Sequence, residues 1–148
     1  MRKNYVVIDT NVFISAIIGQ INFPRKIFDE IVLINEVKIC LSKEVLEEYE
    51  EVAGRKKFAK FKGFEERALE LIEDIKRISI WFEPKEVIDV LTDKDDNMFI
   101  ELAVEANANY IVSGNTNDFT FKEFRGISIL TPKEFYEEWQ ILQSKYFL

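Results

Sequence analysis

The sequence predicts an α/β fold, specifically a three-layer α/β/α sandwich around a mostly parallel central sheet. Two observations predict it. Short apolar runs of strand length alternate along the chain with longer segments whose apolar residues recur at helical spacing. This alternation is typical of parallel strands joined by helices that cover both faces of a sheet. The chain has 148 residues, 47% of them hydrophobic, and it shows no internal repeat or linker, so we expect one domain over residues 1–148.

The first half of the chain contains two strand signals and three helix signals. Pro24 suits the first turn of a helix, where its missing N–H has no intrahelical partner to lose. Ser42 is a favourable N-cap and precedes an apolar stripe at helical spacing. The elements expected here are the strand Tyr5–Asp9, helices over Asn11–Ile18 and from Pro24 to about Asn35, the strand Val37–Leu41, and a helix from Ser42 to about Ala53.

The second half continues the alternation and ends in a helix. Thr131 and Glu134 form a capping box, with Pro132 at the first helical position. The elements expected here are a helix over Glu65–Arg77, the strand Ser79–Phe82, a connection over Pro84–Leu91, a helix that opens at Asp95 or Asp96, the strands Tyr110–Ser113 and Ile127–Leu130, and a C-terminal helix after Thr131.

The absence of histidine restricts the chemistry more than any motif does. Without histidine the chain cannot perform Ser-His-Asp or Cys-His catalysis, or the two-histidine acid–base chemistry of metal-free ribonucleases. Ordinary structural zinc sites, which use cysteine and histidine, are excluded as well. Carboxylate, hydroxyl, lysine or metal chemistry remains for an enzyme.

The single cysteine and the hydropathy of the chain bear on its location. Cys40 lies within the apolar run Val37–Leu41, so we expect a core residue, and one cysteine cannot form a disulfide within the chain. No run of about 18 uncharged apolar residues would cross a membrane, and no cleavable leader precedes the first strand. We therefore expect a cytoplasmic protein with no membrane span.

Acidic residues gather where the predicted strands end. Asp9 ends the first apolar run, Asp96 opens the helix that leads to Tyr110–Val112, and Asp118 follows that strand. In open α/β sheets, ligands bind outside the carboxyl ends of the strands. Converging carboxylates repel one another and resist desolvation, and a hard divalent cation is the usual remedy. The pattern therefore predicts a metal site at this edge.

Each acid also has a purely structural interpretation. Asp9 and Asp96 occupy positions suited to capping the next helix, and Asp118 suits a turn or a cap. In the helix after Ser42, acids are typical of a solvated face. At about 100° per residue, Glu48 and Glu50 both flank its apolar stripe, and periodicity does not choose between them.

A basic segment interrupts this acidic chain. The net charge is −7, which argues against simple electrostatic binding of nucleic acid. Between Glu51 and Glu65, however, there is no acid, and the segment is rich in cations and aromatic rings. Such a stretch can bind a phosphate backbone and stack on bases, or it can be a connecting helix whose rings fill the core. Its members are Arg55, Lys56, Lys57, Phe58, Lys60, Phe61, Lys62 and Phe64.

Four segments of the chain resemble the motifs of PIN domains in order. They are Val7–Phe13, the helix Ser42–Tyr49, Asp95–Phe99 and Ile111–Phe119. The resemblance extends from Val6 to about Phe135 and is greatest to prokaryotic PIN proteins assigned as toxins of toxin–antitoxin pairs. It implies an endoribonuclease that depends on Mg²⁺ or Mn²⁺. By motif, the acidic triad is Asp9, Glu48 and Asp96, the fourth acid is Asp118, and the polar neighbours are Asn11 and Asn115.

The resemblance also separates the two glutamates and shows one departure. Glu48 takes the place of the motif glutamate just before Tyr49, so it is preferred to Glu50. Many family members carry aspartate where this chain has Asn115 and Asn117, which lowers the charge available to a second metal position. In this interpretation Asp9, Asp96, Glu48 and Asp118 bind metal, or hold waters around it.

Partners and rival functions follow from the same comparison. The resemblance implies an RNA substrate, a small antitoxin protein that blocks the acidic cleft, and a homodimer. The aromatic C-terminal stretch from Phe135 to Phe147 would either contribute to the dimer interface or pack on the sheet. One rival is a non-catalytic PIN-like module that binds RNA or protein. Another is a phosphatase of the haloacid dehalogenase type, which requires an aspartate where this chain has Asn11.

Overall fold

The computed structural model describes residues 4–19, 21–114, 119 and 121–146. In this part of the chain six strands form one sheet in the order β3-β2-β1-β4-β6-β5. All neighbouring strands are parallel except β5, which runs antiparallel to β6. The predicted mostly parallel sheet is therefore confirmed. The strands are β1 Tyr5–Ile8, β2 Lys38–Leu41, β3 Ile80–Trp81, β4 Tyr110–Val112, β5 Glu123–Phe124 and β6 Ile127–Leu130.

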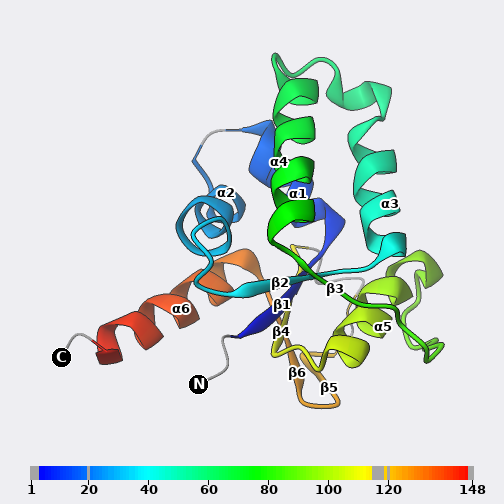
Figure 1. Cartoon of the computed structure of the whole chain (residues 1–148), viewed down its shortest axis with the longest axis vertical. Helices are drawn as coiled ribbons and strands as arrows, with labels where there is room; N and C mark the ends of the chain where they lie inside the picture. The colour runs from blue at the N-terminus through cyan, green and yellow to red at the C-terminus, as the bar shows by residue number, and fades with distance from the viewer. Residues whose placement is uncertain (1–3, 20, 115–118, 120, 147–148) are drawn as a thin grey trace.

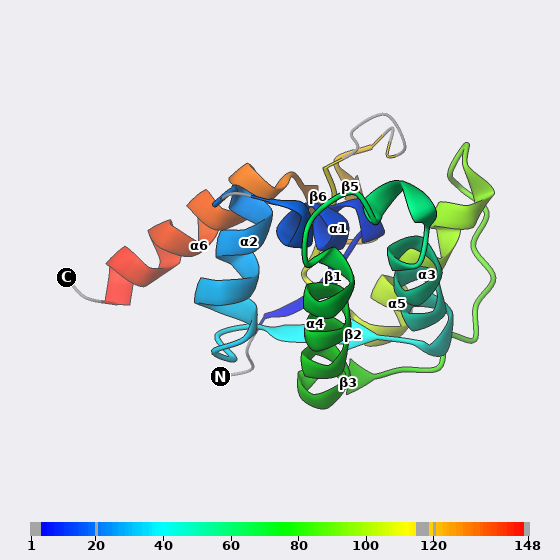
Figure 2. The ribbon, with the colours of Figure 1, turned by 90° about the horizontal axis from the view of Figure 1, so that it is seen from above.

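Helices cover both faces of the sheet, as the alternating pattern predicts. Figure 1 shows α5 and α6 on opposite sides of β4 and β6, and Figure 2 shows the same two helices on opposite sides of the molecule. On one face α5 contacts β1, β2 and β4, whereas α6 packs with α2, which in turn contacts α1. Figure 1 shows α3 and α4 side by side, joined at the end that points away from the sheet. The helices are α1 Thr10–Ile18, α2 Phe23–Ile27, α3 Lys43–Ala53, α4 Phe64–Ile78, α5 Asn97–Ala106 and α6 Pro132–Tyr146.

Strand β1 lies at the centre of the sheet and determines where the polar ends meet. It pairs with β2 on one side and with β4 on the other. In register with β4, Ile8 lies opposite Val112, so the residues after both strands emerge next to each other. The side chains of β1 from Val6 to Ile8 are completely buried, which anchors the residue that follows them.

Two local features differ from the sequence prediction. The helix expected from Pro24 to about Asn35 divides into the short α2 and a π-helical segment, Phe28–Val32. Strand β5 was not predicted, because it has only two residues and forms a tight hairpin with β6. Arg125 and Gly126 form its turn with positive φ angles of 49° and 82°, the backbone that two-residue hairpins require.

Three side chains for which the sequence predicted a core position, or left one open, are buried in the structure. Cys40 is completely buried, as expected for a core cysteine. Phe135 and Tyr136 of α6 are buried against the body of the protein, where the Phe135 ring meets Tyr110 at 5.6 Å. These two aromatic side chains therefore pack inside rather than forming an exposed interface. Among the described helices, none combines the length and the apolar character needed to cross a membrane.

Candidate active site

Asp9 stands at the carboxyl end of β1, where its side chain is held by the neighbouring strand. Its backbone N–H donates to Val112 O at 2.9 Å, which continues the parallel ladder by one residue. The Ser113 hydroxyl donates to Asp9 Oδ2 at 2.6 Å, and Asp9 is only 4% exposed. The Asp9 side chain makes no capping hydrogen bond to α1. Its carboxylate is therefore directed by β4, and the capping interpretation of Asp9 does not describe it.

Asn11 provides a second tie between the ends of β1 and β4. Asn11 Oδ1 accepts a hydrogen bond from Gly114 N at 3.2 Å. This bond holds the start of α1 against the segment that follows β4. Two predicted site residues, Asn115 and Asp118, come directly after that segment but lie outside the described residues, as does Asn117.

Glu48 reaches the same region from α3, and Tyr49 fixes the position of that helix. The Tyr49 hydroxyl donates to Ile8 O, one residue before Asp9. Its completely buried ring stacks on Phe13 at 4.8 Å, and burial raises the pKa of Tyr49, so the phenol stays a donor. Ser42 begins α3 as predicted, accepting from Val45 N at 3.2 Å.

The structure also separates the two candidate glutamates. Glu48 is half-buried and borders a pocket that Asp9 also borders, whereas Glu50 is exposed and does not reach it. Burial is the largest cause that raises the pKa of Glu48, followed by the negative charge of Glu51. The charges of Asp95 and Asp9 act in the same direction, while Arg55 opposes them. Glu48 therefore lies in the negative field of the neighbouring acids.

Asp96 is placed by the long connection that precedes α5. It is half-buried at the N-terminus of that helix, after a 3₁₀ turn, Lys94–Asp96, and its side chain makes no capping hydrogen bond. Asp93 instead accepts from Asp95 N at 3.0 Å. This hydrogen bond orders the acidic turn, and Asp96 is among the residues that border the pocket.

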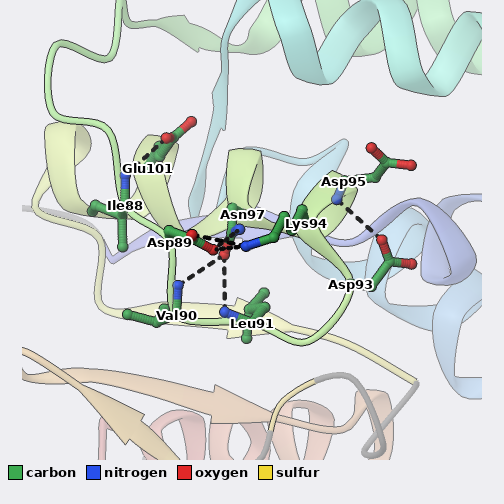
Figure 3. A network of polar contacts seen from close by, with 9 residues as sticks. All are labelled: Ile88, Asp89, Val90, Leu91, Asp93, Lys94, Asp95, Asn97 and Glu101. Carbon is green, nitrogen blue, oxygen red and sulfur yellow. Dashed lines mark hydrogen bonds and ion pairs between the residues drawn. The ribbon is translucent and has the colours of Figure 1, made fainter.

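Figure 3 shows the hydrogen bonds that attach this connection to α5. Asn97 Oδ1 accepts from Val90 N at 3.3 Å and from Leu91 N at 3.1 Å. Glu101 Oε2 accepts from Ile88 N at 2.9 Å. The Asn97 side chain is buried, 7% exposed, and its Nδ2 donates to Asp89 Oδ1 at 3.4 Å. A connection without helix or strand is thereby held against the helix whose first turn carries Asp96.

The acids meet on one pocket of about 350 Å³, which we call the acid pocket. Among the residues that the structure describes, four acids border it, and they arrive from the end of β1, from α3 and from the turn before α5. Two cations from the α3–α4 connection border it as well. Its lining consists of Asp9, Thr10, Asn11, Ile14, Ser15, Glu48, Val52, Arg55, Lys57, Phe58, Asp93 and Asp96.

The donors of the acid pocket fit a hard cation in chemical type. Magnesium prefers oxygen ligands and commonly uses one or two carboxylates, with waters and substrate phosphate completing its coordination. Thr10 Oγ1, from the pocket lining, is buried with no hydrogen-bond partner among the described residues, so it offers a further oxygen. Within that same part of the chain, no group of three or more acidic or cysteine side chains is arranged to hold a metal by itself.

Three residues of this site were not among the predicted site residues. Ser113 and Tyr49 lie within the motif segments, but their bonds to β1 depend on strand register, which the sequence pattern does not specify. Asn97 follows Asp96 directly, and its partners lie in a connection with no periodicity. A polar residue inside an apolar helical face was the available signal for Asn97, because such a side chain needs partners when buried.

Comparison with known proteins gives one family and two similar proteins. A family model described as "PIN domain" matches residues 5–117. The uncharacterized protein MJ1680 of Methanocaldococcus jannaschii is 35% identical over 148 residues, with 93% of each chain covered. A similar fold occurs in the crystal structure of VapBC2 from Rickettsia felis bound to a DNA fragment from their promoter. That match has a TM-score of 0.55 and 15% identity, and it covers 86% of this chain and 98% of the other.

Proposed function

The chain belongs to the PIN-domain family, and on that premise we propose that it is an endoribonuclease that hydrolyses RNA phosphodiester bonds with Mg²⁺ or Mn²⁺. The observation that carries the proposal is the meeting of Asp9, Glu48 and Asp96 on one pocket, although they come from three separate elements. Acids brought together at the carboxyl edge of a sheet cost free energy unless a ligand uses them.

In the proposed mechanism Asp9 and Asp96 would hold the metal ion, with Glu48 beside them on the same pocket. When bound, such an ion supplies a better nucleophile from water and neutralises charge that develops on the phosphate oxygens. Ser113 keeps the Asp9 carboxylate in one orientation through its 2.6 Å hydrogen bond. Burial first, and then the charge of Glu51, raise the pKa of Glu48, which makes its carboxylate a stronger base; it would orient the attacking water and accept its proton.

The remaining predicted site residues have supporting roles in this proposal. Asn11 holds Gly114 and so fixes the start of the segment that carries Asn115 and Asp118. We assign Asn115 and Asp118 to waters or to the outer coordination of the ion, where hydrogen bonds orient ligands. No step requires histidine, which the chain lacks.

We further propose that the protein is the toxin of a toxin–antitoxin pair. The fold shared with VapBC2 from Rickettsia felis supports this assignment, together with the motifs. A small antitoxin would block the acid pocket, with a basic side chain against its four acids. The homodimer and the cytoplasmic location expected from the sequence stay predictions.

A non-catalytic PIN-like module that binds RNA or protein is the second candidate. The specific observation in its favour is that the described residues contain no group of three acids arranged to hold a metal. In that case the acids of the pocket would contribute charge only. Metal binding therefore decides between the two candidates.

The test is thermal unfolding of the wild type and of Asp9→Asn, Glu48→Gln and Asp96→Asn, with and without millimolar Mn²⁺. A ligand that binds only the folded state stabilises it by roughly 2.7 kcal/mol at 100 times its Kd, a shift of several degrees. We expect that shift in the wild type and its loss in all three variants. Glu50→Gln is the matched control, since Glu50 lies two residues away but outside the pocket, and it should keep the shift.

Cleavage of single-stranded RNA is the companion measurement. We expect Asp9→Asn and Asp96→Asn to lower the rate by about 100-fold or more, the order seen when one group that stabilises transition-state charge is removed. A wild type that neither gains stability from Mn²⁺ nor cleaves RNA would overturn the proposal in favour of the binding module.

A further inference from the structure

The connection between α3 and α4 brings positive charge to a pocket otherwise bordered by acids. We call its residues 55–62 the basic connection; it includes a 3₁₀ turn, Lys56–Phe58. Of the described charged residues that border the acid pocket, four are acidic, and the two basic ones, Arg55 and Lys57, both come from this connection. The pocket therefore has one cationic border.

The charge of this connection is largely unneutralised. Arg55 pairs with Glu51, its Nη2 lying 2.9 Å from Oε2. In the part of the chain that the structure describes, the four lysines of the connection have no ion pair, whereas lysines elsewhere do, such as Lys94 with Asp89. These four exposed lysines are Lys56, Lys57, Lys60 and Lys62. Lys57 is the one that combines an unpaired charge with a place on the pocket.

The position of Lys57 is supported from the core. Its Nζ lies 5.1 Å from the centroid of the Phe58 ring. The half-buried Phe58 stacks on Phe64 at 5.2 Å, and Phe64 is only 2% exposed. Phe58 and Phe61 thus pack against the core while the lysines remain in water, as the structural interpretation of the sequence predicted, but the segment forms a 3₁₀ turn in place of the connecting helix that it expected. A cation resting on an anchored ring loses less freedom when it binds an anion.

We propose that Lys57 binds a backbone phosphate of single-stranded RNA next to the phosphodiester that is cleaved. The inference rests on the proposed function and names its substrate subsite. A strand whose cleaved bond enters the acid pocket carries its neighbouring phosphates across the rim. Four acids repel those phosphates, and Lys57 is the unpaired cation on that rim. The subsite would make the pocket select a polynucleotide over a free nucleotide.

The test measures binding without cleavage, in the full chain carrying Asp96→Asn. A short fluorescein-labelled single-stranded RNA of mixed sequence is titrated at several salt concentrations, and fluorescence anisotropy gives the association constant. Each phosphate contact to a single strand contributes about 0.7 to the slope of log K against log salt. Lys57→Ala should lower that slope by about 0.7 and weaken binding several-fold at low salt, and Lys57→Arg should restore both.

Lys62→Ala is the matched control. Lys62 belongs to the same connection and is also exposed and without an ion pair among the described residues, but it does not border the acid pocket. It should keep the parent slope. Equal slope losses in Lys57→Ala and Lys62→Ala would overturn the proposal, because they would indicate a diffuse positive field rather than a subsite.

A second arm repeats the titration with labelled polyglutamate. Binding as tight as that of RNA, with the same loss in Lys57→Ala, would also overturn the proposal and assign this surface to an acidic protein. Weak polyglutamate binding that is indifferent to Lys57 supports the RNA subsite. Failure of the proposed function appears separately, in the Mn²⁺ shift and in RNA cleavage, neither of which this binding measurement uses.

Discussion

The acid pocket has two borders that are built in opposite ways. On the acidic border, Asp9 is 4% exposed and accepts a hydrogen bond from Ser113, and the connection that leads into the turn of Asp96 is attached to α5 through the buried Asn97. On the basic border, Arg55 and Lys57 are exposed. The acids are therefore placed by the interior of the fold, and the cations by a surface connection.

This difference matches what each border is proposed to do. Chemistry at a phosphodiester requires groups held in place before the substrate arrives, because reorganisation during the reaction raises the barrier. Contact with a phosphate backbone relies on charge that acts over several ångströms and tolerates movement. Substitutions on the acidic border should therefore change stability as well as activity. Substitutions on the basic border should change RNA binding, with stability kept within about 0.5 kcal/mol.

The largest effect on stability should come from Asn97→Ala. The substitution removes the acceptor of Val90 N and Leu91 N. The Leu91 bond is the buried one, and leaving a buried donor unsatisfied costs roughly 1–3 kcal/mol. The connection that precedes the acidic turn also loses its attachment to α5. We expect a lower free energy of unfolding in urea, together with a smaller Mn²⁺ shift, because Asp96 is no longer held.

Asp89→Asn is the control for that experiment. Asp89 is exposed and pairs with Lys94 at 2.8 Å, in the same network (Figure 3). Exposed ion pairs contribute about 0–1 kcal/mol, so this variant should remain near the wild type. An Asn97→Ala protein as stable as Asp89→Asn would contradict the view that buried hydrogen bonds build the acidic border.

The next effect concerns Tyr49, which joins the helix of Glu48 to the strand of Asp9. Tyr49→Phe keeps the ring on Phe13 but removes the hydrogen bond to Ile8 O. A typical intramolecular hydrogen bond contributes about 1 kcal/mol. We expect a loss of that size in urea unfolding and a weaker Mn²⁺ shift, because Glu48 and Asp9 are no longer tied together.

Tyr110→Phe provides the comparison for Tyr49. Tyr110 is partly buried, whereas Tyr49 is completely buried, and the Tyr110 hydroxyl makes no hydrogen bond among the described residues. Removal of the Tyr110 hydroxyl should leave the free energy of unfolding and the Mn²⁺ shift close to the wild-type values. If Tyr49→Phe behaves like Tyr110→Phe, the position of Glu48 depends on packing alone.

The parts of the fold that the sequence predicts are those with a local physical signal. Ser42 and Thr131 begin helices because their side chains accept from N–H groups three residues ahead, and the capping box of Glu134 closes on Thr131 N at 2.9 Å. The alternation of strands and helices was enough to predict a mostly parallel sheet. Because ligands bind outside the carboxyl ends of parallel strands, the sequence predicts that Asp9 and Asp96 share one site. Both residues border the acid pocket.

The parts that the sequence did not predict depend on contacts between distant segments. Ser113 and Asp9 are 104 residues apart, and only the register of β1 with β4 makes them neighbours. Periodicity left Glu48 and Glu50 equivalent, because both flank the stripe of α3; their separation depends on where α3 lies relative to β1. Asn97 belongs to the same class, since its partners have no pattern of their own.

The smallest effect should be a gain in stability, from Glu48→Gln without metal. Burial first, and then the charges of Glu51, Asp95 and Asp9, raise the pKa of Glu48 above its ordinary value of 4.5. A carboxyl whose pKa is higher in the folded protein favours folding below its unfolded pKa, and that contribution is lost as the pH rises through the folded pKa. At pH 7 the charged Glu48 therefore destabilises the metal-free fold. Because Glu48 is only half-buried, solvent screens these interactions, and the gain from glutamine should stay within about 1 kcal/mol.

The pH dependence makes this prediction specific. The midpoint of thermal unfolding should be higher for Glu48→Gln than for the wild type at pH 7. The two midpoints should match well below the ordinary pKa of 4.5, where the wild-type carboxyl is neutral in both the folded and the unfolded protein. Glu50→Gln should show no such difference, since Glu50 is exposed outside the pocket. With Mn²⁺ at pH 7 the wild type should have the higher unfolding midpoint, because the negative charge of Glu48 destabilises the metal-free protein but attracts the ion. If Glu48→Gln is less stable than the wild type both with and without Mn²⁺, the Glu48 side chain stabilises the fold itself. That result would contradict a role of Glu48 in binding a ligand at a cost in stability.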